Sequence, residues 1–124
     1  MSLPEKEAEV VWEGDSLDVL RTFPKGIRED LGADIRRLQV GERPLHSRSM
    51  KSIGKGVYEL KQVDDAGWYR VIYLNKVGNR LYMLHSFVKK SAKTGQNDLN
   101  IASNRLKAVK ARLLEEKRNA SKKR

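Results

Sequence analysis

The sequence predicts an α+β domain with a mainly antiparallel four-stranded sheet, an N-terminal helix hairpin and a C-terminal helix. Three strand-like runs follow one another between residues 57 and 89 with only short turns between them, and such hairpins imply antiparallel pairing. Apolar residues recur at helical spacing before and after these runs, as amphipathic helices require. At 124 residues the chain can build one hydrophobic core but not two.

The first half of the chain is expected to form one strand and two helices. The apolar run from Glu9 to Trp12 predicts the first strand. Asp15 or Ser16 can cap a short helix, because their side chains accept hydrogen bonds from free helix N–H groups. Pro24 ends that helix and suits the first turn of the next. The second helix has one apolar face, formed by Ile27, Leu31, Ile35 and Leu38.

The second half of the chain is expected to form three strands and a long helix. Residues 41–55 read as a basic loop, broken by glycine and proline. The strands and the last helix follow at residues 57–63, 68–74, 81–89 and from 97 or 98 onward. The order is therefore β-α-α-β-β-β-α. We expect all helices to cover one face of the sheet and the other face to stay partly solvated.

Charge is distributed unevenly along the chain. The formal net charge is +10, but residues 1–20 carry −5, whereas residues 43–93 carry +8 and residues 94–124 carry +6. This asymmetry indicates a nucleic acid or another acidic partner; the alternative is a solubilising surface without a specific partner. Residues 117–124 hold five cations in eight positions and are expected to form a disordered basic tail after a single domain at 1–116.

Composition argues against several classes of site. The chain has no cysteine, and its two histidines, His46 and His85, lie 39 positions apart, so we expect neither a disulfide nor a metal site. No apolar run approaches membrane-spanning length. The N-terminus lacks the pattern of a secretory signal. The sequence therefore predicts a cytoplasmic protein with no cofactor and no membrane partner.

Each of the three central strands carries a cation among apolar neighbours: Lys61, Arg70 and the pair Lys89-Lys90. Burying an unpaired charge is expensive, so cations on adjacent strands suggest a sheet face that is open to an anion such as a nucleic-acid backbone. We expect Lys61 and Arg70 in one open patch, with Lys89 or Lys90 at its rim. The alternative is a cross-strand ion pair between Glu59 and Lys61 or Arg70.

A set of short motifs lies in a fixed order between residues 9 and 114. They are Phe23-Pro24, Gly41 with Pro44, Met50-Lys51-Ser52-Ile53-Gly54, Val57-Tyr58-Glu59-Leu60-Lys61, Trp68-Tyr69-Arg70-Val71-Ile72-Tyr73, Leu84-His85-Ser86-Phe87-Val88-Lys89-Lys90, Lys93-Thr94, and Ala102 with Arg105. In this order they resemble the RelE/HigB superfamily of toxin–antitoxin toxins, in particular its phage-derived HigB-like branch. Two positions depart from it: Lys61 stands where the family usually has arginine, and Ser91 where it often has threonine.

The resemblance implies a RelE-like fold for residues 1–116 and a metal-independent endonuclease that cuts translated mRNA at the ribosome. It also implies neutralisation by a co-encoded antitoxin, often a helix-turn-helix protein. The Lys61 departure bears on this activity, because lysine offers a phosphate a point charge rather than a planar fork.

Cleavage of RNA without a metal requires a base for the 2′-hydroxyl proton, cations for the charged phosphorane and an acid for the leaving 5′-oxygen. Arg70 suits the stabilising role because guanidinium matches phosphate oxygens bidentately. Lys61 and Lys89 can add charge, or one of them can act as base. His85 has the intrinsic pKa for proton transfer; the alternative is a half-buried strand histidine bonded to a backbone carbonyl. These four residues are the predicted catalytic group.

Further residues are predicted to contact RNA: Lys90, Lys93, Lys51, Arg48, His46 and Trp68. Among them, His46 is a second candidate for proton transfer, and Trp68 can either stack an unpaired base or pack in the core. Two other functions stay open on the sequence alone. One is a non-catalytic RNA-binding or partner-binding domain of phage origin, and the other is a phage-derived structural protein.

Overall fold

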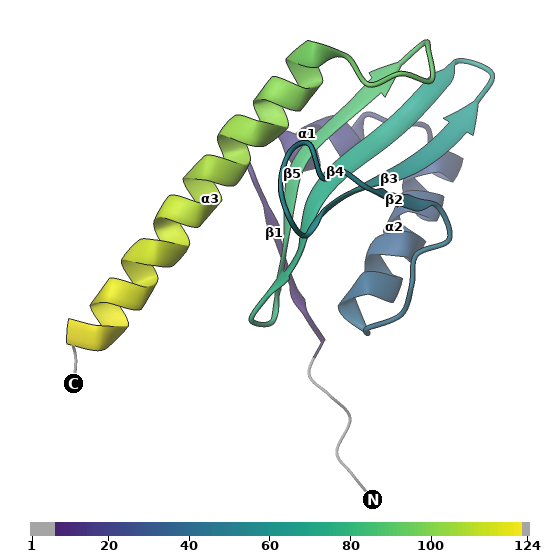
Figure 1. Ribbon diagram of the computed structural model, residues 1–124. Helices are drawn as coiled ribbons and strands as arrows, with labels where there is room; N and C mark the ends of the chain where they lie inside the picture. Colours follow the sequence, from purple (N-terminus) through teal and green to yellow (C-terminus); the bar gives the residue numbers. More distant parts are fainter. Residues whose placement is uncertain (1–6, 123–124) are drawn as a thin grey trace, which may run out of the picture.

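A single five-stranded sheet organises residues 7–122, the part of the chain that the computed structural model describes (Figure 1). The elements in chain order are β1 (Glu9–Trp12), α1 (Ser16–Arg21), α2 (Lys25–Gln39), β2 (Ser47–Ser49), β3 (Val57–Asp64), β4 (Gly67–Val77), β5 (Arg80–Lys89) and α3 (Gln96–Lys122). The strands lie side by side in the order β1-β5-β4-β3-β2. Strand β1 runs parallel to β5, and the other three pairings are antiparallel.

The sheet is therefore five-stranded and mixed, so the predicted count of four strands is wrong. The additional strand is β2, which lies inside the predicted basic loop. Its sequence, Ser47-Arg48-Ser49, has no apolar alternation, and all three residues are exposed. It pairs because β3 offers it an open edge, with Arg48 opposite Glu59. Pairing of this kind depends on whether a segment distant in sequence reaches the open strand edge, and not on the local sequence pattern of that segment.

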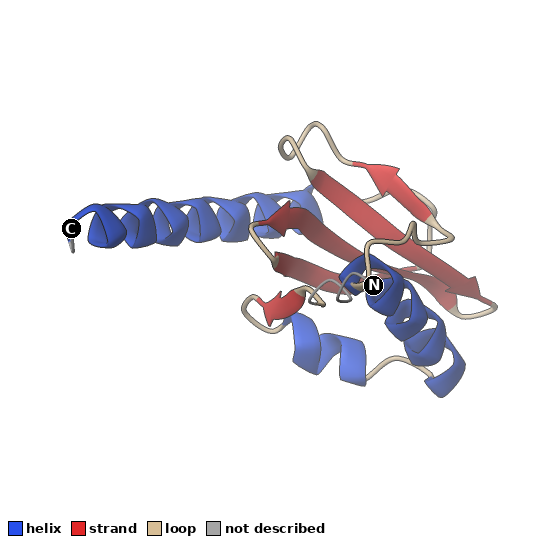
Figure 2. Ribbon diagram, turned by 90° about the horizontal axis from the view of Figure 1, so that it is seen from below, coloured by secondary structure: helices blue, strands red, loops and turns tan. Residues whose placement is uncertain are grey.

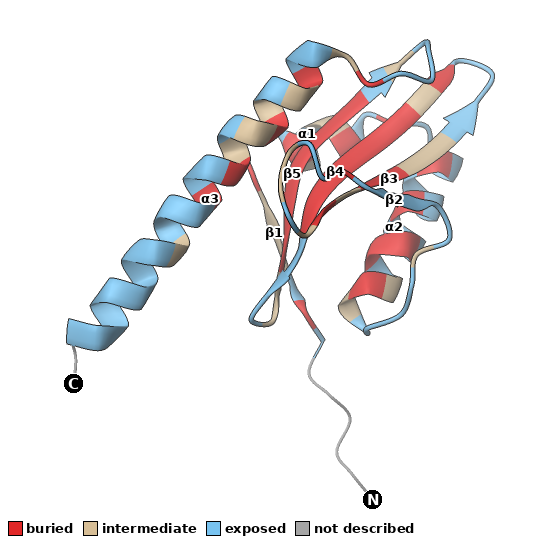
Figure 3. Cartoon of the chain, in the orientation of Figure 1, coloured by how far each residue is buried: buried red, intermediate tan, exposed pale blue. Residues whose placement is uncertain are grey.

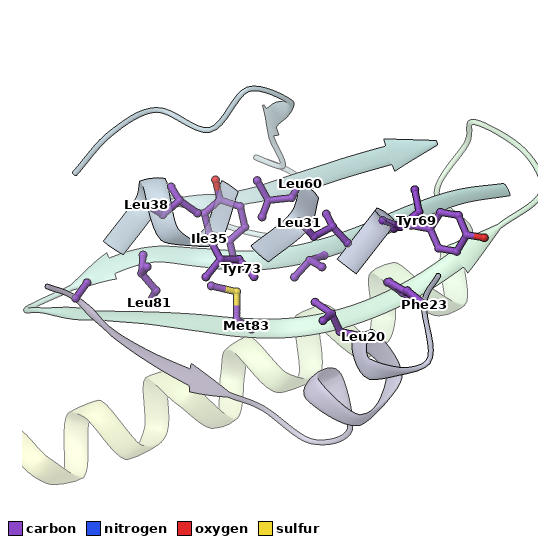
Figure 4. Packing of buried hydrophobic residues seen from close by; sticks show 13 residues of the cluster. Leu20, Phe23, Leu31, Ile35, Leu38, Leu60, Tyr69, Tyr73, Leu81 and Met83 are labelled. Atoms are coloured by element: carbon purple, nitrogen blue, oxygen red, sulfur yellow. The ribbon is translucent and has the colours of Figure 1, made fainter. Parts of the chain in front are cut away.

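The helices form layers on both faces of the sheet, and the prediction that they share one face is wrong (Figure 2). Helices α1 and α2 pack against one face and enclose a cluster that includes Leu31, Leu60 and Met83 (Figure 4). Helix α3 packs against the opposite face through Ala102 and Leu106. Strand residues alternate between the two clusters, as the period of two requires. Both faces of β4 and β5 are consequently buried (Figure 3).

Helix α3 extends well beyond the core. Its last buried residue is Val109, and the side chains from Lys110 to Lys122 are mostly exposed (Figures 1 and 3). Within this segment Leu113 still packs against the core, and Glu116 contacts Arg80 of β5. Residues 117–122 of the predicted disordered tail are thus helical, whereas 123 and 124 lie outside the described residues. No helix within residues 7–122 combines the length and the hydropathy needed to cross a bilayer.

Candidate functional site: a cationic cleft beside a buried ion pair

Arg70 is buried, so the predicted open patch centred on it is wrong. Its side chain is 2% exposed and donates hydrogen bonds to the Glu59 carboxylate and to the carbonyl oxygen of Ala92. The alternative of a cross-strand ion pair with Glu59 is the arrangement found. The cover does not come from the N-terminal helices. It comes from the loop before α3, which lies on the other face of the sheet.

Glu59 is the centre of this arrangement and is fully buried. The hydroxyl of Thr94 donates to its Oε2 at 3.0 Å, and the Nε of Arg48 lies 3.2 Å from its Oε1. Three residues far apart in sequence therefore hold this carboxylate: Arg48, Arg70 and Thr94. A buried charge is tolerated only when it is paired and hydrogen-bonded in this way.

The exposed cations gather on the solvent side of Glu59. A cleft of about 260 Å³ is lined by Leu45, His46, Ser47, Arg48, Glu59 and Lys61, and we call it the His46 cleft. The Lys61 N–H donates to the His46 carbonyl at 3.2 Å, which fixes the start of β2 against β3. Because Arg48 is opposite Glu59 in the register, alternation places His46, Arg48 and Lys61 along one face of the sheet.

The ring of Trp68 lies next to Lys61 and Arg70. Lys61 Nζ lies 5.1 Å and Arg70 Cζ 5.7 Å from the centroid of its ring. Both distances are within the range of cation–π attraction. Lys61 and Trp68 are partly exposed, so this pair, unlike Arg70, is accessible to a ligand.

His85 lies in a different cluster. Its Nε2 is 2.8 Å from Asp98 Oδ1, and Lys89 Nζ is 2.8 Å from Asp98 Oδ2. The ring stacks on Phe87 at a centroid distance of 4.9 Å. Both His85 and Asp98 are buried, so His85 is bonded to a carboxylate and not to the backbone carbonyl that the sequence offered as the alternative. In the register Ile72 separates His85 from Glu59, and the His46 cleft does not include it.

Asp98 is the polar residue that the sequence analysis did not connect to the site, since the sequence placed residue 98 only at the start of the last helix. Its hydrogen bond with His85 spans 13 positions in sequence and depends on how α3 packs on the sheet.

The remaining predicted RNA contacts are distributed over two surfaces. Lys51 and Lys93 line a cavity of about 430 Å³ together with Arg48 and Thr94, next to the His46 cleft. Lys90 lies instead beside Phe23, on the face covered by α1.

Arg105 connects α3 to two other elements. Its Nη1 donates to the Leu84 carbonyl at 3.0 Å, and its Nη2 donates to Asp15 Oδ1 at 2.8 Å. The hydrogen bond from Arg105 holds the pKa of the Asp15 carboxyl below its ordinary value of 3.8. Asp15 thereby ties the start of α1 to the helix on the opposite face of the sheet.

Replacing Asp15 by asparagine should reduce the pH dependence of stability in acid. A lowered folded-state pKa adds stability that is fully present above 3.8 and is lost as pH falls through the lower folded value. Urea unfolding midpoints of the wild type and Asp15→Asn should therefore differ at about pH 6 and converge near about pH 2. Asp18→Asn, at an exposed position on α1, is the matched control. A constant gap between wild type and Asp15→Asn across this range would contradict the prediction.

The fold and the site define an α+β protein with a small cationic cleft beside a buried carboxylate–guanidinium pair. Residues 18–107 match the family described as Phage derived protein Gp49-like (DUF891), and the chain belongs to that family. This family is associated with toxin–antitoxin modules. No curated protein and no solved structure matches the chain.

Proposed function

We propose that this protein is the toxin of a toxin–antitoxin module with a RelE-like fold, and that it cleaves translated mRNA at the ribosome without a metal ion. Membership of the Gp49-like family supports the toxin role. The observation that carries the nuclease role is the His46 cleft, which is lined by a histidine, two cations and a fixed carboxylate. A cytoplasmic location follows from this proposal.

The proposed reaction uses the 2′-hydroxyl of RNA as nucleophile. His46 accepts its proton while the 2′-oxygen attacks the adjacent phosphorus. Arg48 and Lys61 stabilise the negative charge that develops on the phosphoryl oxygens. The bond from phosphorus to the 5′-oxygen breaks, and a water molecule donates a proton to the departing oxygen. The products are a 2′,3′-cyclic phosphate and a 5′-hydroxyl.

The buried residues next to the cleft position the side chains that take part in this reaction. Glu59 is held by Arg70 and Thr94, and it orients the Arg48 guanidinium toward the cleft. Trp68 sits against Lys61 and offers an aromatic surface to an unpaired base. His85 and Lys89 share Asp98, so we assign them to docking α3 and not to proton transfer.

Cleavage should continue in the presence of a chelator and should leave the 2′,3′-cyclic phosphate or its 3′-phosphate product. Our reason is that residues 43–93 contain three acids against eleven cations, whereas metal nucleases gather carboxylates to hold their ions. The test is incubation of purified protein with labelled RNA and EDTA, followed by end-group analysis. Loss of cleavage in EDTA with recovery on adding magnesium would overturn the mechanism but leave the toxin assignment standing.

RNA binding should weaken steeply with salt. Each phosphate neutralised on a single strand contributes a slope of about 0.7 log units of affinity per log unit of salt, and residues 43–124 carry a formal +14. Removing residues 117–124 should lower affinity without unfolding the domain, because the last buried residue of α3 is Val109. Titrations against salt, together with thermal unfolding of the truncated chain, test both expectations. A flat salt response would show that this charge serves something other than nucleic acid.

A non-catalytic RNA-binding or partner-binding domain is the second candidate function. It is favoured by the internal ion pairs that occupy Arg70 and His85, two of the four predicted catalytic residues. Induced expression separates the two candidates. A nuclease toxin should arrest growth, generate new mRNA ends and be relieved by a neighbouring helix-turn-helix antitoxin. Growth arrest without new mRNA ends would favour the binding domain.

A further inference from the structure

A larger cavity lies across β2 from the His46 cleft. It measures about 700 Å³ and is enclosed by the end of α2, the loop at residues 41–44, β2, β3 and β4. We call it the α2 cavity. Its wall includes Tyr58 and Tyr73, which belong to the cluster beneath α1 and α2, so it opens on the other face of the sheet. Its size is within the range of small-ligand sites.

The rim of the α2 cavity is positively charged. Arg43, Arg48 and Lys76 line it, and Glu42 is the only acid among the lining residues. The three cations come from the loop after α2, from β2 and from the end of β4. Convergence of cations from three elements on one hollow favours an anionic ligand.

The floor of the α2 cavity is aromatic and fixed. The rings of Tyr58 and Tyr73 stack with centroids 5.8 Å apart and planes 26° apart. The hydroxyl groups of Tyr73 and Ser47 are hydrogen-bonded at 3.1 Å, and burial raises the pKa of Tyr73. Tyr73 is thus uncharged and fixed in position. The half-buried Tyr58, which stacks on it, presents an aromatic surface to the cavity. A nucleobase can pack on such a surface.

Lys76 reaches this rim through a strained backbone. Its φ is +67°, in the left-handed region that non-glycine residues rarely adopt. The register of β4 and β5 shifts between Leu74 and Val77, so Lys76 lies in a β-bulge. Bulges redirect side chains near functional sites, and strain of this kind concentrates where a ligand is held.

From these features we propose that the α2 cavity is a nucleotide subsite for single-stranded RNA. It takes a nucleotide that flanks the cleaved linkage, with the base against Tyr58 and the phosphate among Arg43, Lys76 and Arg48. Arg48 lines both the α2 cavity and the His46 cleft, so the RNA strand crosses the edge strand β2 at this residue. The proposal rests on the proposed RNA substrate and adds the path of the strand beyond the cleft.

The test compares single-stranded RNAs of two and six nucleotides by fluorescence anisotropy. The double variant Arg43→Ala/Lys76→Gly should bind the six-nucleotide RNA about tenfold more weakly, and its affinity for the dinucleotide should equal that of the wild type. Lys76→Gly alone should raise the melting temperature, because glycine adopts the left-handed conformation without strain. Weaker binding of the six-nucleotide RNA by the double variant would then not be caused by unfolding. Lys55→Ala, which removes an exposed cation from the loop before β3, is the matched control.

Failure of the subsite alone and failure of the nuclease alone give different results. Equal weakening by Lys55→Ala, or six-nucleotide affinity unchanged in the double variant, would overturn the subsite even if the wild type cleaves RNA. Length-dependent weakening in a protein that never cleaves RNA would support the subsite and reject the nuclease. No binding of either RNA by the wild type would reject both. Binding of an acidic peptide, and not of RNA, at the α2 cavity would also overturn the proposal.

Discussion

Replacing Arg70 by alanine is expected to lower the free energy of unfolding by about 3–5 kcal/mol, the range for leaving a buried charge without its partner. Glu59 is fully buried, and its other cation, Arg48, has an exposed side chain that water screens. Urea denaturation measures the change. The matched control is Arg36→Ala, whose ion pair with Glu7 is more than half exposed on both sides, so its loss should leave the free energy of unfolding nearly unchanged.

A double variant distinguishes the buried charge from lost packing. Glu59→Gln combined with Arg70→Met removes both charges, and we expect it to recover most of the stability lost in Arg70→Ala. If Arg70→Ala unfolds at the wild-type urea concentration, Glu59 does not depend on Arg70. The sequence also predicts that Arg70 stabilises the charged phosphorane. Since Arg70 is buried, activity must now be compared per folded molecule.

Substitutions of the two histidines should affect different properties, His46 the cleavage rate and His85 the stability. His46→Ala is expected to lower the rate of RNA cleavage by about 10²–10⁴, the usual contribution of a positioned acid or base, and to leave stability unchanged because His46 is exposed. His85→Ala should lower the free energy of unfolding by about 1.5–3 kcal/mol through loss of its hydrogen bond with Asp98. In the folded fraction its cleavage should persist.

Cleavage rates and urea midpoints of both histidine variants measure this separation, and the pH profile adds an independent readout. The wild-type rate should rise with pH, because a base must be deprotonated before it can accept the 2′-hydroxyl proton. His46→Ala should lose that rise, and His85→Ala should keep it. A folded His85→Ala variant without activity, next to an active His46→Ala variant, would return the catalytic role to His85.

Replacing Lys61 tests the point at which the chain departs from the RelE/HigB pattern. Lys61→Arg should preserve or raise cleavage, since arginine offers a phosphate two parallel donors. Lys61 is partly exposed next to Trp68, so the longer side chain has room at the mouth of the cleft. Steady-state cleavage rates measure the effect. A large loss would show that the ammonium, as proton donor, is what the reaction needs.

Several features follow from the sequence alone because they are local. The period of two along residues 57–89 predicted the three central strands, each with a cation among apolar neighbours. The spacing of Ile27, Leu31, Ile35 and Leu38 predicted α2 and its buried side. These patterns were sufficient because a strand or helix shows its periodicity within a few residues.

Other features were decided only by the tertiary structure. Periodicity says which residues share a face but not what covers that face. Docking of α3 and its preceding loop onto the cationic face buried Arg70 against Glu59 and joined His85 to Asp98. Strand β2, which has no apolar pattern, formed because the edge of β3 was open, and it carried His46 and Arg48 to Lys61. The sequence alone therefore predicts which residue types form the candidate site. The location of the site depends on contacts between distant segments, and a local sequence pattern does not indicate the free energy of such contacts.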